Sequence, residues 1–172
     1  MSKVGFGIHS RQVASTYDEK FNVLEWCKLI EPHNPAYFCT FTTQHELTLN
    51  SIRTAMEVYV RNLRSLCTID EKIFFFWCAE AFELKAGYHS HGLLSIPETF
   101  KVGQGFKALT KVWHKSSGTN RARTHFAPVR KQIDGIRYVT KYATKERADW
   151  DIHNTNGIIK NTIPGVLEAF RK

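Results

Sequence analysis

The stretch that decides the fold lies at residues 73–96 and reads IFFFWCAEAFELKAGYHSHGLLSI. Its first part, residues 73–80, is a continuous apolar run rich in aromatic residues, which predicts a buried strand. The run Lys85-Ala86-Gly87 predicts a turn. Residues 88–96 predict the returning strand, so the stretch as a whole predicts a β-hairpin.

This hairpin gathers three possible metal ligands. Residues two apart on a strand point to the same face, so His89 and His91 present two imidazoles side by side. With an even-numbered turn, Glu80 lies opposite or diagonal to them on that face. One carboxylate and two imidazoles suit a divalent ion, Mg²⁺ or Mn²⁺, that must also bind a phosphate oxygen. We therefore predict Glu80, His89 and His91 as metal ligands.

The same residues also have a plain structural interpretation, in which Glu80 is a surface residue and the histidines form a solvated strand face. A one-residue change in the turn would move Glu80 to the other face of the sheet and break the site. His114 and His125 are possible substitutes as ligands.

Strands and helices alternate around the hairpin. We expect a strand at 37–43, a helix from Asn50 or Ser51 to Leu66, a helix at 104–115, a strand at 123–129 and a helix at 133–149. Residues 1–35 are expected to be an irregular lead-in with a short element at 23–30, and the tail from Trp150 a loop and a short helix. The order β-α-β-β-α-β-α predicts an α+β fold, a small antiparallel sheet with split βαβ (ferredoxin/RRM-like) topology covered by helices.

The length of 172 residues predicts a single domain, with a core at about 37–148 and with 1–36 and 149–172 as extensions. The N-terminus lacks the apolar core of a signal peptide, and the longest apolar run is too short to span a bilayer. Cys27, Cys39, Cys67 and Cys78 form no Cys-x-x-Cys pair and are interpreted as reduced structural thiols. We expect a soluble protein of the cytoplasm with no membrane partner.

Two predicted helices are amphipathic. The first has a buried stripe made of Ile52, Met56, Tyr59, Leu63 and Leu66. On the second, the apolar side consists of Ile133, Ile136, Val139 and Ala143, and the opposite side carries Tyr138, Lys141, Tyr142 and Lys145. Tyrosines at this spacing are commonly core residues, but here aliphatic side chains already occupy the core side.

The polar side of the second helix has the groups that a tyrosine nucleophile needs. A phenol has a pKa of about 10, so it is a weak nucleophile at neutral pH unless neighbouring charges help it. An ammonium such as that of Lys141 and a metal-bound phosphate would stabilise the developing charges. Tyr138 lies nearer the centre of the polar side than Tyr142, which slightly favours Tyr138.

The net charge of +8 is unevenly distributed. Residues 101–145 contain eleven of the 24 basic residues and one acidic residue, Asp134. A basic surface can be a solvated face, but beside candidate tyrosines it fits a polyanion that is held by its phosphates. The residues that we expect to contact nucleic acid are Lys107, Lys111, Arg121, Arg123 and Lys145.

With these motifs identified, the chain resembles the HUH endonucleases that start rolling-circle replication. That family has an apolar first strand, a His-hydrophobic-His strand and a helix with Tyr-x-x-Lys, and 38–43, 89–91 and 138–141 match in this order. The run at 138–145 looks most like the two-tyrosine initiators of small single-stranded DNA phages. Ser90 departs from the pattern, because the family prefers a large apolar residue between the histidines.

The resemblance implies a metal-dependent nick in single-stranded DNA at a replication origin, either a plain strand or a hairpin. A tyrosine, Tyr138 or Tyr142, would form a 5′-phosphotyrosine and leave a 3′-OH, and the reverse reaction would rejoin ends. Lys141 would stabilise charge or donate a proton. The chain has no Gly-x-x-x-x-Gly-Lys loop, so a separate or host helicase and polymerase are the expected partners.

Three other interpretations of the sequence remain open. A non-catalytic binder of single-stranded nucleic acid would use Phe41, Phe74, Phe76 or Tyr88 as stacking platforms. A transposase or relaxase of the same superfamily would share the chemistry. An iron oxygenase would use two histidines and one carboxylate, but the strongly basic segment disfavours it.

Overall fold

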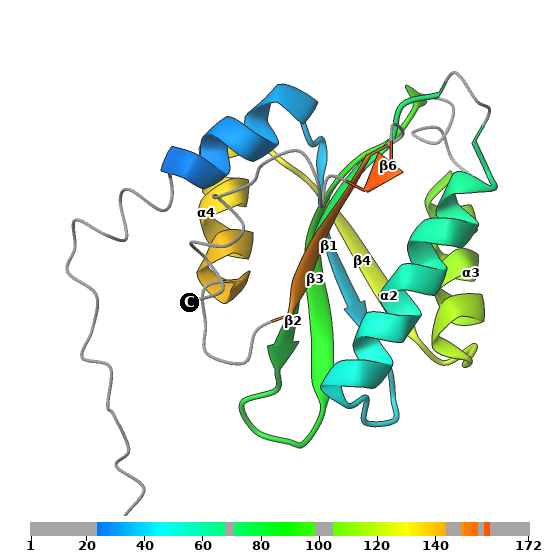
Figure 1. Ribbon diagram of the computed structural model, residues 1–172. Coiled ribbons are helices and arrows are strands. Elements are labelled where there is room, and N and C mark those ends of the chain that lie inside the picture. Colours follow the sequence, from blue (N-terminus) through cyan, green and yellow to red (C-terminus); the bar gives the residue numbers. More distant parts are fainter. Residues whose placement is uncertain (1–23, 68–70, 99–104, 144–148, 155–156, 159–172) are drawn as a thin grey trace, which may run out of the picture.

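The computed structural model describes residues 24–67, 71–98, 105–143, 149–154 and 157–158. One six-stranded sheet with strand order β4-β1-β3-β2-β5-β6 is covered by helices on both faces (Figure 1). The elements are η1 (Glu31–His33), β1 (Tyr37–Thr42), α2 (Leu49–Arg64), β2 (Phe74–Ala81), β3 (Tyr88–Ser95), α3 (Gly105–Ser117), β4 (Arg123–Pro128), α4 (Gln132–Ala143), β5 (Trp150–Asn154) and β6 (Gly157–Ile158). All strand pairs are antiparallel, and the order of the first four strands is that of a split βαβ fold. The predicted α+β class is confirmed.

The β2–β3 hairpin has the pairing that the sequence predicts. Glu80 lies directly opposite His89, and Ala81 opposite Tyr88, so the connecting turn has an even number of residues. The turn closes with a hydrogen bond from the amide of Phe82 to the carbonyl of Gly87, 3.0 Å long. Gly87 has a φ of 95°, a conformation that favours glycine. The turn therefore fixes which residues of both strands share a face.

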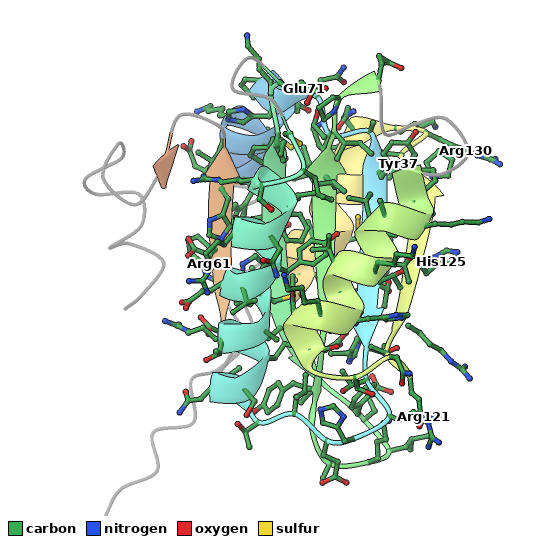
Figure 2. All side chains as sticks on the ribbon, turned by 90° about the vertical axis from the view of Figure 1, so that its right-hand side faces the viewer. Tyr37, Arg61, Glu71, Arg121, His125 and Arg130 are labelled. Atoms are coloured by element: carbon green, nitrogen blue, oxygen red, sulfur yellow. The ribbon has the colours of Figure 1, made fainter. Side chains whose placement is uncertain are left out.

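One face of the sheet packs against α2 and α3 and forms an aromatic core, seen from the helix side in Figure 2. Phe41 of β1 is completely buried there. Its ring makes edge contacts with the rings of Tyr59, Phe75 and Trp113, with centroids 4.9, 5.8 and 5.3 Å away. Ser90, which replaces the apolar residue of the HUH pattern, is also completely buried on this face. We call this layer the closed face.

Helix α2 differs from its prediction at both ends. Its N-cap is Thr48, whose hydroxyl accepts a 3.1 Å hydrogen bond from the amide of Ser51, so the expected caps Asn50 and Ser51 lie inside the helix. The helix ends at Arg64, and Leu66 is 43% exposed, not buried as predicted. The helical period no longer applies after Arg64, so it does not turn Leu66 toward the sheet. The other predicted members of the stripe, Ile52, Met56, Tyr59 and Leu63, are buried.

The second face of the sheet is covered by α4 and by a helical segment at residues 24–30 that continues into η1. The predicted irregular lead-in is therefore wrong for residues 24–33, where Trp26 and Ile30 are buried against the sheet. On α4, the predicted core residues Ile136, Val139 and Ala143 are buried. A Cβ on Gly135 would lie 3.2 Å from Leu93 Cδ2, so glycine allows α4 to approach β3 closely.

The chain after α4 differs most from its prediction. The expected helix extends to Asp149, but α4 ends at Ala143, and residues 150–154 form strand β5, which pairs with β2. Asp149 enters this strand through a 2.7 Å hydrogen bond from the amide of Ala79 to its carbonyl. Its carboxylate accepts two hydrogen bonds from the guanidinium of Arg53 on α2. Residues 144–148 and the expected final helix lie outside the described residues.

No helix in the described part of the chain combines the length and apolarity needed to cross a membrane. Cys27, Cys39 and Cys78 are buried free thiols, and Cys67 is a partly buried one. Burial raises the pKa of the Cys39 thiol well above its ordinary value. These observations agree with the predicted structural role of the cysteines.

Candidate metal centre and active site

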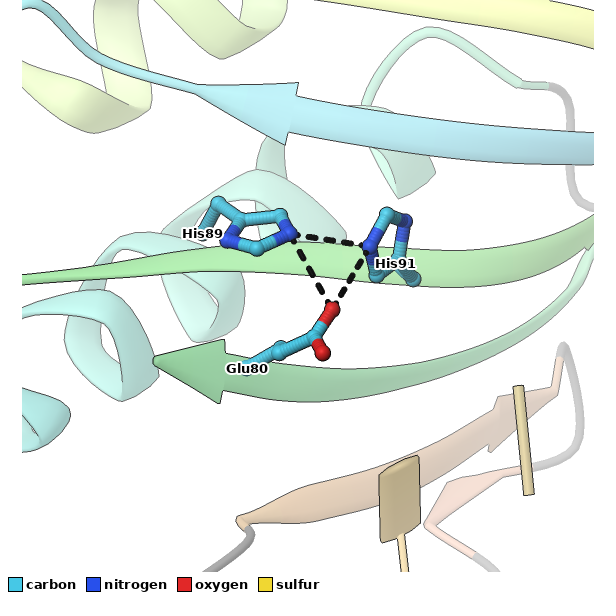
Figure 3. A group of neighbouring side chains, drawn as sticks. All are labelled: Glu80, His89 and His91. Atoms are coloured by element: carbon cyan, nitrogen blue, oxygen red, sulfur yellow. Dashed lines mark hydrogen bonds and ion pairs between the residues drawn. The ribbon is translucent and has the colours of Figure 1, made fainter. Parts of the chain in front are cut away.

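Glu80, His89 and His91 lie together on the second face, at the end of the β2–β3 hairpin (Figure 3). His91 Nε2 lies 2.9 Å from His89 Nε2 and 3.1 Å from Glu80 Oε2, and His89 Nε2 lies 3.3 Å from the same oxygen. The hairpin register accounts for this convergence, since Glu80 pairs with His89 and its face includes His91. The structure thus brings the three predicted ligands together.

The spacing of these atoms fits a divalent ion. Three ligand atoms at right angles around an ion, each about 2.1 Å from it, lie about 3 Å from one another. The three observed distances are of this size, and the carboxylate and imidazole groups occupy only one side of such an ion. Open positions remain for oxygen atoms of a substrate. The donor set and its geometry therefore fit the expected Mg²⁺ or Mn²⁺.

Neighbouring side chains orient both imidazoles. Thr40 Oγ1 of β1 lies 3.2 Å from His91 Nδ1, so a proton on Nδ1 leaves the Nε2 lone pair directed toward Glu80. The ring of Phe38 stacks on His91 with centroids 5.5 Å apart, and Phe82 stacks on His89 at 4.5 Å. Sequence reasoning missed Thr40 and Phe38, because the register of β1 against β3 is not encoded in either strand alone.

Burial also favours the state of His89 that binds a metal. Removal from water is the largest influence on its pKa and lowers it from the ordinary value, while the carboxylate of Glu80 acts in the opposite direction. A lowered pKa keeps the imidazole neutral, as a metal ligand must be. Among the described residues, no hydrogen-bond partner satisfies the buried Nδ1 of His89.

Tyr138 of α4 reaches the same place from the helix side. Its ring makes edge contacts with Phe38 and His91, at centroid distances of 5.0 and 5.7 Å, and it is 45% exposed. It lines a cleft of about 490 Å³ together with the three candidate ligands. The cleft is continued by the β2–β3 turn, where the ammonium of Lys85 lies 4.0 Å from the centre of the Phe82 ring. The candidate nucleophile and the candidate metal site therefore share one cleft.

The other predicted residues of the tyrosine helix are less fully described. Lys141 is exposed on α4. Tyr142 belongs to α4 one turn after Tyr138, but its side chain lies outside the described part of the structure, as does Lys145.

The predicted nucleic-acid contacts are spread over both sides of the molecule. Lys107 and Lys111 are exposed on α3, the helix that covers the closed face. Arg121 is exposed just before β4 (Figure 2), and Arg123 is exposed on β4 opposite Thr42. Of these four, only Arg123 shares a strand face with Thr40 and the cleft.

The aromatic platforms expected for a non-catalytic binder are unsuitable. Phe41, Phe74 and Phe76 are at most 2% exposed, so they cannot stack on bases. Tyr88 is half-buried and packs against the core of the closed face. That interpretation loses the surface on which it depended.

Comparison with known proteins gives one match. Residues 36–147 match the family described as replication-associated protein ORF2/gene 2 protein, and the matched range includes Thr40, the three candidate ligands and Tyr138. No curated protein and no solved structure is significantly similar to the chain. The match spans more than half of the 172 residues, and the chain therefore belongs to this family of replication-associated proteins.

Proposed function

We propose that this protein is a metal-dependent endonuclease and strand transferase that nicks single-stranded DNA at a replication origin. The observation that carries the proposal is the shared cleft, in which a half-exposed tyrosine ring lies 5.7 Å from the ring of a candidate metal ligand. Membership of a replication-associated family supports a role at an origin. The proposal includes the HUH type of chemistry and the two-tyrosine subtype.

In this proposal Glu80, His89 and His91 hold Mg²⁺ or Mn²⁺, which when bound withdraws charge from the scissile phosphate. Tyr138 Oη attacks the phosphorus, its O–P bond forms, and the bond from phosphorus to the 3′ oxygen breaks. The phenolic proton is lost, and the leaving oxygen ends as a 3′-OH. Lys141 stabilises charge or donates the proton to that oxygen. Attack of a 3′-OH on the phosphotyrosine reverses these changes and rejoins DNA ends.

Tyr142 is the proposed second nucleophile. Two tyrosines one helical turn apart could alternate, one cutting at the start of a replication round and the other at its end. Unwinding and synthesis would be supplied by a separate or host helicase and polymerase.

A gel assay for a covalent protein–DNA adduct tests the proposal. Labelled single-stranded oligonucleotides of randomised sequence are incubated with Mn²⁺ or with EDTA, using wild type, Tyr138→Phe, Tyr142→Phe and the double variant. Tyr37→Phe is the matched control, because Tyr37 contacts Phe106 on the closed face. We expect an adduct that requires Mn²⁺, persists in Tyr37→Phe and is absent from the double variant. An adduct that the double variant still forms would remove both tyrosines from the mechanism.

The role of the proposed metal ligands has a separate test. His89→Ala or His91→Ala should abolish Mn²⁺-dependent cleavage and retain most single-strand binding, because basic side chains hold the phosphates. Binding measured by fluorescence anisotropy and cleavage measured on gels separate the two effects. Equal losses of binding and cleavage would contradict this division of roles.

A further inference from the structure

A second cleft of about 320 Å³ lies on the other side of Tyr138 from the candidate metal site. It is lined by Phe38, Val129, Arg130, Lys131, Asp134 and Tyr138, together with Pro128 and Gly135. Tyr138 lines both clefts, and Phe38 contacts Tyr138 and His91 while lining the second cleft. The two clefts therefore adjoin at the candidate nucleophile.

The second cleft is held in shape by hydrogen bonds that do not involve its open side. The amide of Val129 donates to the carbonyl of Ala36 over 2.9 Å. Gln132 Nε2 donates to the carbonyl of Pro35 at 2.8 Å and to Asn34 Oδ1 at 3.1 Å. The β4–α4 connection is thus tied to the segment before β1. A ligand would meet a site that is already formed, which reduces the entropy cost of binding.

The lining combines the three chemical features of a nucleotide site. Phe38 and Val129 are half-buried and give an apolar wall for a base. Arg130 and Lys131 are exposed at its rim and give cations for a phosphate (Arg130 is labelled in Figure 2). We propose that this cleft binds one nucleotide of single-stranded DNA. The base lies against Phe38, and a backbone phosphate contacts Arg130 and Lys131.

Asp134 indicates which bases the cleft would accept. It is the only acidic residue among the eleven basic residues of 101–145, and it lines the cleft. A carboxylate repels a phosphate but accepts hydrogen bonds from the amino groups of cytosine, adenine or guanine. Thymine has no amino group. The subsite should therefore prefer an amino-bearing base to thymine.

The adjacency of this nucleotide to the scissile phosphate rests on the proposed function, because it takes Tyr138 as the nucleophile. The existence of the subsite does not, since it depends only on the lining of the second cleft. Binding measured without metal can therefore test the subsite even if the protein never cuts DNA.

The first test compares two double variants with equal loss of charge. Arg130→Gln/Lys131→Gln removes the rim cations, and Arg61→Gln/Lys115→Gln removes exposed cations from α2 and α3 on the closed face. The probe is a fluorescein-labelled oligodeoxycytidylate of about 15 nucleotides, in EDTA, at several salt concentrations. We expect the rim variant to bind about tenfold more weakly and its log–log salt slope to fall by about one to two, with little change in the control. Equal affinity of the two variants would overturn the subsite.

The second test asks about the base. Wild type should bind oligodeoxycytidylate more tightly than oligothymidylate by about fivefold or more, and Asp134→Asn should reduce this ratio toward one. Thermal unfolding of each variant checks that the fold is retained, because Asp134 also lies in the first turn of α4. An unchanged ratio in a folded Asp134→Asn variant would overturn the base contact.

The outcomes separate the two proposals. A protein that forms no covalent adduct but shows both binding effects keeps the subsite and loses the proposed nicking function. A protein that forms the adduct but shows neither effect keeps the nicking function and loses the subsite.

Discussion

The two faces of the sheet use alternate residues of the same strands, yet they differ completely in chemistry. On β3, Ser90 faces the core under α2 and α3, whereas His89 and His91 face the cleft. On β2, Ala79 is buried in the closed face and Glu80 lines the cleft. The closed face stabilises the fold, and the second face, which α4 covers only in part, has room for polar groups and a substrate.

This difference teaches that stability and chemistry are separated by a shift of one residue along a strand. A side chain on the closed face contacts many buried groups, so its loss should destabilise the fold. A polar side chain at the cleft is supported by a few directed contacts, so its loss should affect binding far more than folding. The following predictions test this separation in order of decreasing effect.

Phe41→Ala should have the largest effect. It removes a completely buried ring that contacts three other aromatic rings on the closed face, which should lower the free energy of unfolding by about 3–5 kcal/mol. Denaturant unfolding in EDTA measures the loss.

His91→Ala, from the same sheet but the other face, is the comparison for Phe41→Ala. In EDTA it should cost much less stability than Phe41→Ala while removing measurable Mn²⁺ binding. If both variants lose the same unfolding free energy without metal, the two faces do not differ in the way argued above.

Thr40→Val should weaken metal binding without unfolding the protein. Valine keeps the shape of the side chain but lacks the hydroxyl at 3.2 Å from His91 Nδ1, so the imidazole loses its orienting partner. Loss of such a partner typically reduces metal affinity by about 10–100-fold. Titration calorimetry with Mn²⁺ measures the change. Thr42→Val, two residues along the same strand and on the same face, is the control and should retain the affinity.

His33 should make stability depend on pH at the edge of the second face. Its ring stacks on Phe74 at 4.3 Å, and burial lowers its pKa below the ordinary value. Between the lowered folded value and the ordinary unfolded value of about 6.5, the unfolded chain binds more protons. The contribution is thus fully present above about pH 6.5 and lost as the pH falls. His33→Phe should flatten the rise in unfolding free energy between about pH 5 and pH 7, and an unchanged slope would exclude this origin.

Leu66→Ala should have the smallest effect. Leu66 lies beyond the end of α2 and is 43% exposed, so its truncation should change the unfolding free energy by less than about 0.5 kcal/mol. Leu63→Ala, one turn earlier and 1% exposed, should cost about 2–5 kcal/mol. Thermal unfolding of the two variants side by side would show whether the stripe ends where the structure places its end.

The hairpin and the core side of α4 could be predicted because their patterns are local. An even-numbered turn determines that Glu80 faces the same side as His89, and the helical period determines that Ile136 and Val139 share a side. Each of these relations needs only a few neighbouring residues, all of them visible in the sequence.

The parts that could not be predicted depend on distant pairings. Strand β5 forms because Ile152 pairs with Phe76, and nothing in the short run from Trp150 to Asn154 indicates that partner. Asp149 likewise lies beside Arg53 only in the folded chain. The contact between Thr40 and His91 needs the register of β1 against β3, which both strands set together. The second cleft needs, in addition, the way in which β4 leads into α4.

The three proposed ligands come from one hairpin, whereas Tyr138 arrives later in the chain on α4. Closing the short loop between residues 80 and 89 costs less chain entropy than docking a helix that follows a further helix and strand. The expected order of assembly is therefore the ion-binding pocket first and the nucleophile second. A folding chain could then hold an ion before it can cut DNA, and the docking of α4 would be the step that arms it.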